Sequence, residues 1–281
     1  MVPFAFFGSS RFSVIILDEL ERAGFIPAII VTTPDKPQGR KLELKANPVK
    51  EWAIAKNIKF ITPSKLDSDL IEKLKIENCE LFVVASYGKI IPQSVLDVPT
   101  HRTLNIHPSL LPKYRGASPL QSAMLADDKE TGVTIMRIDA EMDHGPIIAQ
   151  KGVTMNAWPT YEDFEERMAR EGAQLLSQVM PQWVAGEIKE KEQDHSSATY
   201  TKKTVKEDGF IDLAGDPYLN FRKIQAYHEW PQAYFFVEKN GKKMRVKVTS
   251  ATFKDNALII EKVIPEGGKE MSYGDFKRGY L

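Results

Sequence analysis

Apolar positions follow two periodicities along most of the chain. Apolar and strand-like segments predict strands at residues 3–7, 26–32, 58–61, 81–85, 104–107, 132–138 and 145–155. The uninterrupted apolar run 81–85 is typical of a strand covered on both faces of its sheet. Apolar residues that recur every third or fourth position predict helices at residues 12–23, 48–56, 66–74 and 161–184. Because strands alternate with helices, we predict an α/β fold with a Rossmann-like, mostly parallel sheet.

The pattern changes near residue 186. Residues 186–203 are charged and poor in large apolar side chains, which predicts a linker. A helix is predicted at 218–227. Antiparallel strands with short turns between them are predicted at residues 233–238, 243–253 and 257–263. We therefore predict a first domain over residues 1–185, the linker, and a small OB-like β-barrel domain over residues 204–281.

Composition narrows the class of protein. With 281 residues, 42% hydrophobic and 27% charged, the chain resembles a soluble globular protein of two domains, which excludes collagen, coiled coil and extended disorder. No apolar run reaches the roughly 18–20 residues that cross a bilayer, so we expect no membrane partner. The single cysteine, Cys79, cannot form an internal disulfide, and the first residues lack the basic segment of a signal peptide. We expect a cytoplasmic protein.

The net charge of zero conceals a basic C-terminal part. Residues 199–281 contain 15 Lys and Arg against 11 Asp and Glu, a net charge of +4, and the remainder of the chain therefore carries −4. Such a surplus fits contact with a polyanion. A random fluctuation of composition also explains it.

The first candidate for chemistry is the pair Asn105 and His107, at the end of a predicted strand. Strand side chains alternate between faces, so the two point the same way, roughly 7 Å apart. Ligands of an open parallel sheet bind beyond the carboxyl ends of its strands. An amide and an imidazole at this edge are therefore a candidate oxyanion site. The alternative is a pair of hydrogen-bonded structural residues.

Two loops downstream add to this pair. Residues 108–116 form a loop bracketed by prolines, whose leucines Leu110 and Leu111 are expected to be exposed or to line a pocket, unless the loop is an ordinary turn with core leucines. Asp143 follows the predicted strand 132–138. It is either a solvated turn residue or a carboxylate held near Asn105 and His107.

These segments carry a family resemblance. The string LNIHPSLLPKYRGASPLQSAM, followed by ETGVTIMRIDAEMDHGPI, strongly resembles the folate-dependent formyltransferases, and the chain is most similar to the methionyl-tRNA formyltransferases among them. The opening FFGSSRFSVIILDEL and the C-terminal KEDGFIDL, EWPQAY and PEGGKEMSYGDFKRGY also resemble that family. The resemblance implies a formyltransferase catalytic domain, a C-terminal tRNA-binding domain, and transfer of a formyl group from 10-formyltetrahydrofolate to initiator methionyl-tRNA.

The resemblance also implies roles for individual residues. Asn105 and His107 would stabilise the oxyanion that develops during transfer, and Asp143 would accept the proton of the attacking amine. The folate would lie against two loops, formed by Ser86, Tyr87 and Gly88 and by Ser109, Leu110, Leu111 and Pro112. Tyr87 could equally be a packed aromatic. We expect no metal, because the five histidines lack the spacing of a metal motif.

On the acceptor side, the loop 35–50 looks like the family's insertion toward the acceptor arm of tRNA. The basic residues expected to contact tRNA are Arg40, Lys41 and Lys45 in this loop and Lys202, Lys203 and Lys206 after the linker. Without the resemblance, a solvated charged loop and an ordinary lysine-rich surface explain them. We expect a monomer.

One departure concerns the residues after Asp143. The family pattern has a small polar residue and then Gly, often followed by an acid, whereas this chain has His144, Gly145 and Pro146. The Gly-Pro pair is similar to that of the glycinamide-ribonucleotide formyltransferases. Two other functions therefore stay open. One is a formyltransferase for a small amine, such as a sugar nucleotide or a ribonucleotide. The other is a non-catalytic tRNA-binding or folate-binding module.

Overall fold

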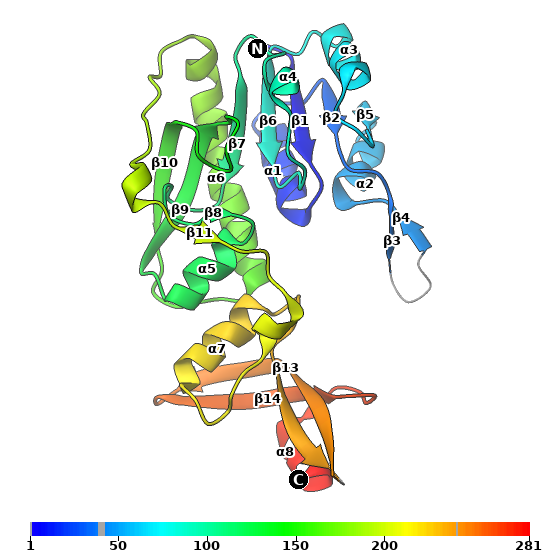
Figure 1. The fold of residues 1–281 in the computed structure, drawn as a ribbon, viewed down its shortest axis with the longest axis vertical. Helices are drawn as coiled ribbons and strands as arrows, with labels where there is room; N and C mark the ends of the chain where they lie inside the picture. The colour runs from blue at the N-terminus through cyan, green and yellow to red at the C-terminus, as the bar shows by residue number, and fades with distance from the viewer. Residues whose placement is uncertain (1, 39–42, 240) are drawn as a thin grey trace. The chain divides into compact units, whose positions relative to one another are not determined.

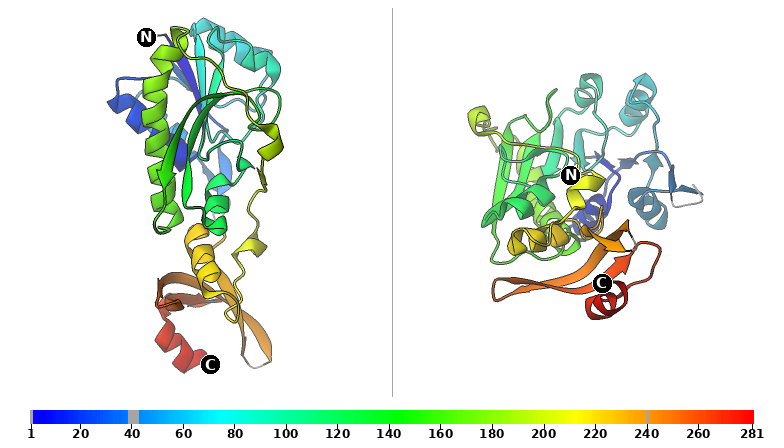
Figure 2. Two further views of the ribbon diagram at one scale, coloured as in Figure 1. Left: turned by 90° about the vertical axis from the view of Figure 1, so that its left-hand side faces the viewer. Right: turned by 60° about the horizontal axis from the view of Figure 1, so that its bottom comes forward.

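The computed structural model describes residues 2–38, 43–239 and 241–281 (Figures 1 and 2). The chain forms two compact units, which are described separately. The first consists of residues Met1–Arg115, Gly132–Val153 and Glu166–Tyr200, and the second of Gly116–Thr131, Thr154–Glu165 and Thr201–Leu281. The predicted boundaries of the two domains and the linker stay predictions.

A seven-stranded sheet in the order β10-β9-β7-β6-β1-β2-β5 forms the centre of the first unit (Figure 1). Its strands are β1 (Phe4–Gly8), β2 (Ile29–Val31), β5 (Phe60–Ile61), β6 (Leu81–Ala85), β7 (Thr103–His107), β9 (Glu130–Arg137) and β10 (Ile147–Thr154). The pairs from β7 through β5 are parallel, and β9 is antiparallel to β7. The predicted Rossmann-like, mostly parallel sheet is confirmed.

Helices cover both faces of this sheet, so its central strands are apolar throughout (Figure 2). Every residue of β1 and β6 is buried. The helices are α1 (Arg11–Arg22), α2 (Pro48–Ala55), α3 (Ser68–Ile76), α4 (Gln93–Leu96) and α6 (Tyr161–Val184). The predicted helix at 161–184 has the bounds of α6.

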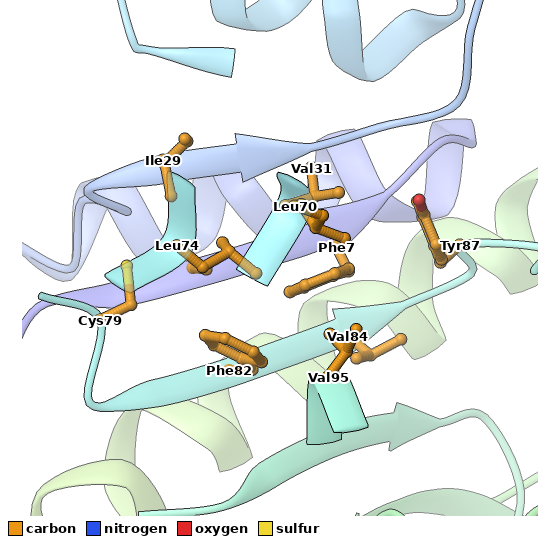
Figure 3. Packing of buried hydrophobic residues seen from close by; sticks show 11 residues of the cluster. Phe7, Ile29, Val31, Leu70, Leu74, Cys79, Phe82, Val84, Tyr87 and Val95 are labelled. Carbon is orange, nitrogen blue, oxygen red and sulfur yellow. The ribbon is translucent and has the colours of Figure 1, made fainter. Parts of the chain in front are cut away.

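One apolar cluster joins the central strands to α3 and α4 (Figure 3). The Phe7 ring lies 5.2 Å from the Phe82 ring and 5.5 Å from the Tyr87 ring, measured between centroids. The contact with Tyr87 is edge to face, an arrangement that aromatic rings favour. This packing fixes the turn that follows β6.

The strand order reverses at β1, because β2 and β6 lie on its opposite sides. Such a switch point opens a crevice at the carboxyl ends of the strands. The hydroxyl of Ser9 donates to the carbonyls of Ser86 and Tyr87, at 3.1 Å each, and that of Ser13 donates to Ala85, at 2.6 Å. The start of α1, capped by Ser10, therefore holds the turn after β6 in place.

The loop expected at residues 35–50 contains a hairpin. Its strands β3 (Lys36–Gln38) and β4 (Glu43–Lys45) pair antiparallel. Asn47 accepts hydrogen bonds from the backbone of Val49 and Lys50 and so begins α2. Arg40 and Lys41, which were expected to contact tRNA, lie outside the described residues.

The second unit contains a four-stranded antiparallel sheet, which confirms the expected C-terminal β structure. Its strands are β12 (Tyr234–Lys239), β13 (Lys242–Lys254), β14 (Ala257–Pro265) and β15 (Met271–Ser272). Its helices are α5 (Pro119–Ala126), α7 (Pro217–Ala226) and α8 (Tyr273–Tyr280). Phe235, Val246 and Phe276 lie in the core of this unit.

Candidate active site

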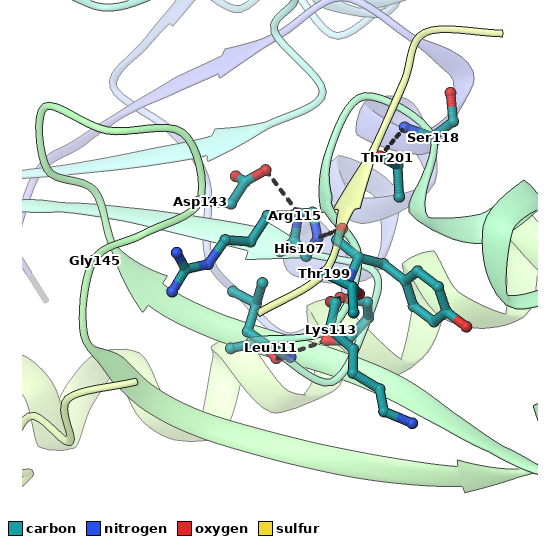
Figure 4. Close-up of polar contacts among 12 residues, drawn as sticks. His107, Leu111, Lys113, Arg115, Ser118, Asp143, Gly145, Thr199 and Thr201 are labelled. Carbon is teal, nitrogen blue, oxygen red and sulfur yellow. Dashed lines mark hydrogen bonds and ion pairs between the residues drawn. The ribbon is translucent and has the colours of Figure 1, made fainter. Parts of the chain in front are cut away.

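The structure brings His107 and Asp143 together at the carboxyl edge of the sheet (Figure 4). His107 is the last residue of β7, and Asp143 lies in the loop between β9 and β10. The distance from His107 Nδ1 to Asp143 Oδ2 is 3.7 Å, with side-chain exposures of 5% and 17%. A carboxylate and an imidazole this close to each other, and this well shielded from bulk water, can act as an acid-base pair.

The other ring nitrogen of His107 is already engaged. Its Nε2 lies 2.9 Å from the carbonyl oxygen of Tyr114. Since a carbonyl only accepts, Nε2 carries the proton of this bond. Nδ1 is therefore the nitrogen that faces Asp143, and it can donate a hydrogen bond only when the ring is doubly protonated.

Asn105 lies two residues before His107 on the same face of β7, half-buried. Its register partners are Val84 on β6 and Met136 on β9. Both neighbouring strands pair with this position, so the backbone of Asn105 is fixed within the sheet. Its amide therefore starts from a rigid element at the edge that carries His107.

The proline-bracketed loop is held from inside by Thr134 of β9. Its buried hydroxyl donates to the carbonyl of Ser109 at 2.6 Å and accepts from the backbone N–H of Leu111 at 3.1 Å. The Ser109 hydroxyl itself donates to the carbonyl of Lys113 at 2.6 Å. These bonds fix the path of the loop behind His107.

The two leucines of this loop differ. Leu111 is 3% exposed and packs with Met136 and Ile147, which fits the alternative of a core leucine. Leu110 is half-buried. Leu111 is buried because its backbone N–H donates to the buried hydroxyl of Thr134. The folate-binding role of Ser109, Leu110, Leu111 and Pro112 stays a prediction.

Asp143 is held in a constrained backbone conformation. Its φ is +50°, in the left-handed region that few residues other than Gly adopt. Gly145 follows, and a side chain there would come within 2.0 Å of the carbonyl oxygen of Arg137. His144 contacts Asp139 through Nδ1 at 2.8 Å and stacks on His195 with ring centroids 4.1 Å apart. The unusual His-Gly sequence after Asp143 therefore belongs to a packed loop.

Residues predicted as a linker contact this site directly. The carbonyl of Thr199 accepts from the backbone N–H of Arg115 at 2.9 Å, its hydroxyl accepts from the N–H of Tyr114 at 2.8 Å, and its N–H donates to Pro112 at 3.2 Å. The short strands β8 (Arg115–Gly116) and β11 (Tyr200–Thr201) pair here (Figure 4). The segment is thus bound to the loop that follows His107.

Four residues that hold the site together were not predicted from the sequence. These are Arg115, Thr134, Gln193 and Thr199, of which Arg115, Thr134 and Gln193 are buried. Arg115 stood in the quoted string SLLPKYRG, but its burial could not be read from the string. Gln193 is surrounded by Lys191, Glu192 and Asp194, so the local pattern indicated solvent.

The turn expected to contact folate lies after β6. Ser86 and Gly88 have positive φ values of +49° and +77°. The side chain of Tyr87 is buried, and its hydroxyl has no hydrogen-bond partner among the described residues. Burial raises the pKa of this phenol to about 12. The Tyr87 side chain is therefore packed in the core, whereas Ser86 and Gly88 are exposed.

The lysines expected to contact tRNA are exposed wherever they are described. Lys45 lies at the end of β4, Lys202 and Lys203 follow β11, and Lys206 begins a short 3₁₀ helix. Lys50, in the same basic loop as Lys45, instead pairs with Asp35 at 2.8 Å.

Three further features of the described residues bear on function. No cluster of three or more His, Cys, Asp and Glu side chains there is placed to hold a metal ion. A cavity of about 450 Å³ lies between β2, β5 and α3, and none of the candidate site residues line it. Within the same ranges, the helices are too short or too polar to cross a membrane.

Comparison with known proteins places the chain in a family. Residues 2–180 match the formyl transferase family. The methionyl-tRNA formyltransferase of Chloroflexus aggregans is 43% identical over 232 residues, covering 82% of this chain and 75% of that protein. A methionyl-tRNA formyltransferase structure from Clostridium thermocellum superposes with a TM-score of 0.63 at 17% identity, covering 97% of this chain and 100% of that one. The N-formyltransferase of Helicobacter canadensis, in complex with folinic acid and dTDP-3-aminofucose, gives 0.65 at 18% identity, with 91% and 89% covered. The chain belongs to the methionyl-tRNA formyltransferase family.

Proposed function

We propose that this protein transfers the formyl group of 10-formyltetrahydrofolate to the free amino group of methionine on initiator methionyl-tRNA. The observation that carries the proposal is the contact between His107 and Asp143 at the carboxyl edge of the sheet. His107 lies two residues after Asn105 on β7. We propose that it acts as a monomer in the cytoplasm, as expected from the sequence.

The formyl donor, when bound, supplies an activated formyl group on a nitrogen that can leave. The residues near the candidate site fit a flat, apolar ligand. Ile90, four residues after Ser86, is 86% exposed, and Met142, next to Asp143, is 62% exposed. A side chain at Gly88 would meet no atom within 4 Å, so the backbone there faces open space. We assign the folate to the turn 86–88 and the loop 109–112, with contacts chiefly through the backbone.

Asn105 is assigned to the formyl oxygen. Attack of an amine places negative charge on that oxygen, and a fixed amide N–H lowers the energy of the charged state. Asn105 suits this role because β6 and β9 hold its backbone from both sides. No solvent reorganisation is then needed as the charge develops.

His107 and Asp143 share the handling of the proton. The amine must lose a proton as the new C–N bond forms, and the departing nitrogen of tetrahydrofolate must gain one. We assign Asp143 as the acceptor, directly or through one water, which contributes roughly 10²–10⁴ in rate. Because Nε2 of His107 is committed to Tyr114, the ring can donate to the formyl oxygen only through Nδ1, as an imidazolium with Asp143 as its counter-charge.

The exposed lysines support tRNA as the acceptor. Lys45, Lys202, Lys203 and Lys206 are all exposed. Together with Arg40 and Lys41 they are proposed to contact phosphates. Each such contact makes binding more sensitive to salt.

The test is a panel of acceptors supplied with 10-formyltetrahydrofolate. Charged initiator tRNA, charged elongator tRNA, an amino sugar nucleotide and a free small amine are compared at equal concentration. Formylation of the initiator alone supports the proposal. Equal or faster formylation of the small amines would instead indicate a small-molecule formyltransferase, and tRNA binding without turnover would indicate a binding module.

A further inference from the structure

The carboxylate of Asp143 lies on a loop that needs outside support. Residues 138–146 lie between β9 and β10 and contain neither a helix nor a strand. Asp143 itself has a φ of +50°, a conformation that costs energy for a residue other than Gly. An acid-base group must stay within a few tenths of an ångström of its working position. Some neighbour therefore has to hold this backbone.

Gln193 provides that support from the segment that precedes β11. Its amide nitrogen donates to the carbonyls of Asp143, at 3.0 Å, and Gly145, at 2.7 Å. Its amide oxygen accepts from Nε of Arg115 at 3.1 Å and from Nη2 at 2.7 Å. Both N–H groups and both lone pairs of the amide are used, and the side chain is buried. Since guanidinium only donates and carbonyls only accept, the amide has one possible orientation.

Arg115 is itself held on several sides. It is 1% exposed, and besides Gln193 it contacts Nδ1 of His195 at 2.8 Å and the hydroxyl of Tyr200 at 3.1 Å. The guanidinium has no acceptor, so Nδ1 of His195 accepts this bond. Gln193 therefore transmits a rigid position to the Asp143 loop.

These contacts close a ring around the candidate site. His107 donates to the carbonyl of Tyr114, the residue before Arg115. The Arg115 guanidinium donates to the amide oxygen of Gln193. The amide nitrogen of Gln193 donates to the carbonyl of Asp143, whose carboxylate lies beside His107. The ring ties both members of the acid-base pair to one buried anchor. A change at Gln193 thus alters the distance between Asp143 and His107 without touching either side chain.

We propose that Gln193 is a positioning residue for formyl transfer, acting through the backbone of Asp143. The inference rests on the proposed function of Asp143. Gln193 is assigned no contact with either substrate. Its removal should slow the chemical step and leave the affinity for both substrates unchanged.

The experiment uses two variants of the full-length protein. Gln193→Leu removes all four hydrogen bonds, and Gln193→Glu keeps the acceptor toward Arg115 while placing an oxygen against the two carbonyls. We expect kcat to fall by about 10-fold to 100-fold in each, since a displacement near 1 Å has an effect of this size. KM for tRNA and for the formyl donor should stay within about twofold. The control Gln174→Leu changes an exposed glutamine on α6 and should retain wild-type kcat.

A double-mutant cycle separates positioning from a general structural role. In an Asp143→Asn background, Gln193→Leu should cause little further loss of kcat, because the group that it positions is already disabled. Losses that multiply would overturn the proposal. Unchanged kcat in both single variants would also overturn the proposal, and so would a change confined to KM. Loss of the folded state in both variants would overturn it as well.

A second readout does not depend on turnover. Amide hydrogen exchange at residues 139–146 should accelerate in Gln193→Leu and Gln193→Glu while exchange in β1 and β6 stays unchanged. If the wild-type protein transfers no formyl group, the proposed function is contradicted. Faster exchange at residues 139–146 in the two variants would in that case still support the role of Gln193 in holding the Asp143 loop. Unchanged exchange in this loop would overturn the positioning role alone.

Discussion

His107 Nδ1 lies 3.7 Å from Asp143 Oδ2, and this contact joins the end of β7 to the loop after β9. With Nε2 of the same ring bonded to Tyr114, the imidazole has one orientation relative to the carboxylate. The ring is therefore held from one side and available for proton handling on the other. The chemistry assigned to the site depends on Nε2 being bonded to Tyr114 while Nδ1 faces Asp143.

Asn105→Ala tests the assignment of the formyl oxygen. Loss of one preorganised donor should lower kcat by roughly 10²–10³. The melting temperature should change little, because the Asn105 side chain is only half-buried. Steady-state kinetics and a thermal melt check both parts. The matched control Asn156→Ala removes an exposed amide and should keep full activity. A similar loss of kcat in this control would contradict the assignment of Asn105 to the formyl oxygen.

The lysines after β11 are tested as a group. Replacing Lys202, Lys203 and Lys206 with Ala should raise KM for tRNA by about tenfold or more at physiological salt and leave kcat nearly unchanged. Each lost phosphate contact should also make the logarithmic salt dependence of binding shallower by about 0.7–0.9.

The control for this group removes three exposed lysines from the first unit. Lys65, Lys73 and Lys75, also changed to Ala, match the loss of charge. An equal rise in KM for tRNA in the control variant would show that the lysines after β11 act only through general electrostatic attraction.

Tyr87→Phe separates packing from ligand binding. The buried hydroxyl has no partner among the described residues, so its removal should raise the free energy of unfolding by about 1–2 kcal/mol. KM for the formyl donor should not change, because the buried Tyr87 phenol is not assigned to the folate. Chemical denaturation and kinetics give the two quantities. An increased KM for the donor would show that the phenol itself contacts the ligand.

Cys79 should be inert in the folded protein. It is 6% exposed, and burial, together with the nearby Glu77, raises the pKa of its thiol from 9.0 to about 11. At pH 8 the thiolate fraction is then on the order of one in a thousand. Reaction with a thiol reagent should be slow in buffer and complete in denaturant. Rapid stoichiometric reaction of the folded protein would contradict this burial.

The same shift predicts a pH dependence of stability. Below pH 9 the thiol is neutral in the folded and unfolded states, so its contribution to stability is fully present. As pH rises from about 9 to about 11, the unfolded chain releases the proton first, and the free energy of unfolding should fall. Denaturation of Cys79→Ala across this range provides the comparison, since that variant should lose less stability.

The central sheet could be predicted from local pattern because burial on both faces leaves a clear trace. The runs FAFFG and LFVVA became β1 and β6, and the long amphipathic stretch became α6. The hairpin of β3 and β4 was missed because its strands are three residues each and polar, so neither periodicity is visible.

The site could be predicted only in part. Asn105 and His107 followed from strand alternation, and Asp143 followed from family resemblance. Gln193 could not be found, since its environment is created by contacts with Arg115 and Gly145, far away in the sequence. Leu111 is buried for a similar reason, through Thr134 on another strand.

The most direct test of the assigned chemistry is the rate of formyl-methionyl-tRNA formation by Asp143→Asn under saturating 10-formyltetrahydrofolate. We expect a fall of roughly 10²–10⁴ relative to the wild-type protein, with tRNA binding and melting temperature retained. The control Glu141→Gln neutralises an exposed acid of the same loop and should keep the wild-type rate. A rate for Asp143→Asn equal to that of the wild type would contradict the assignment of this carboxylate as the base.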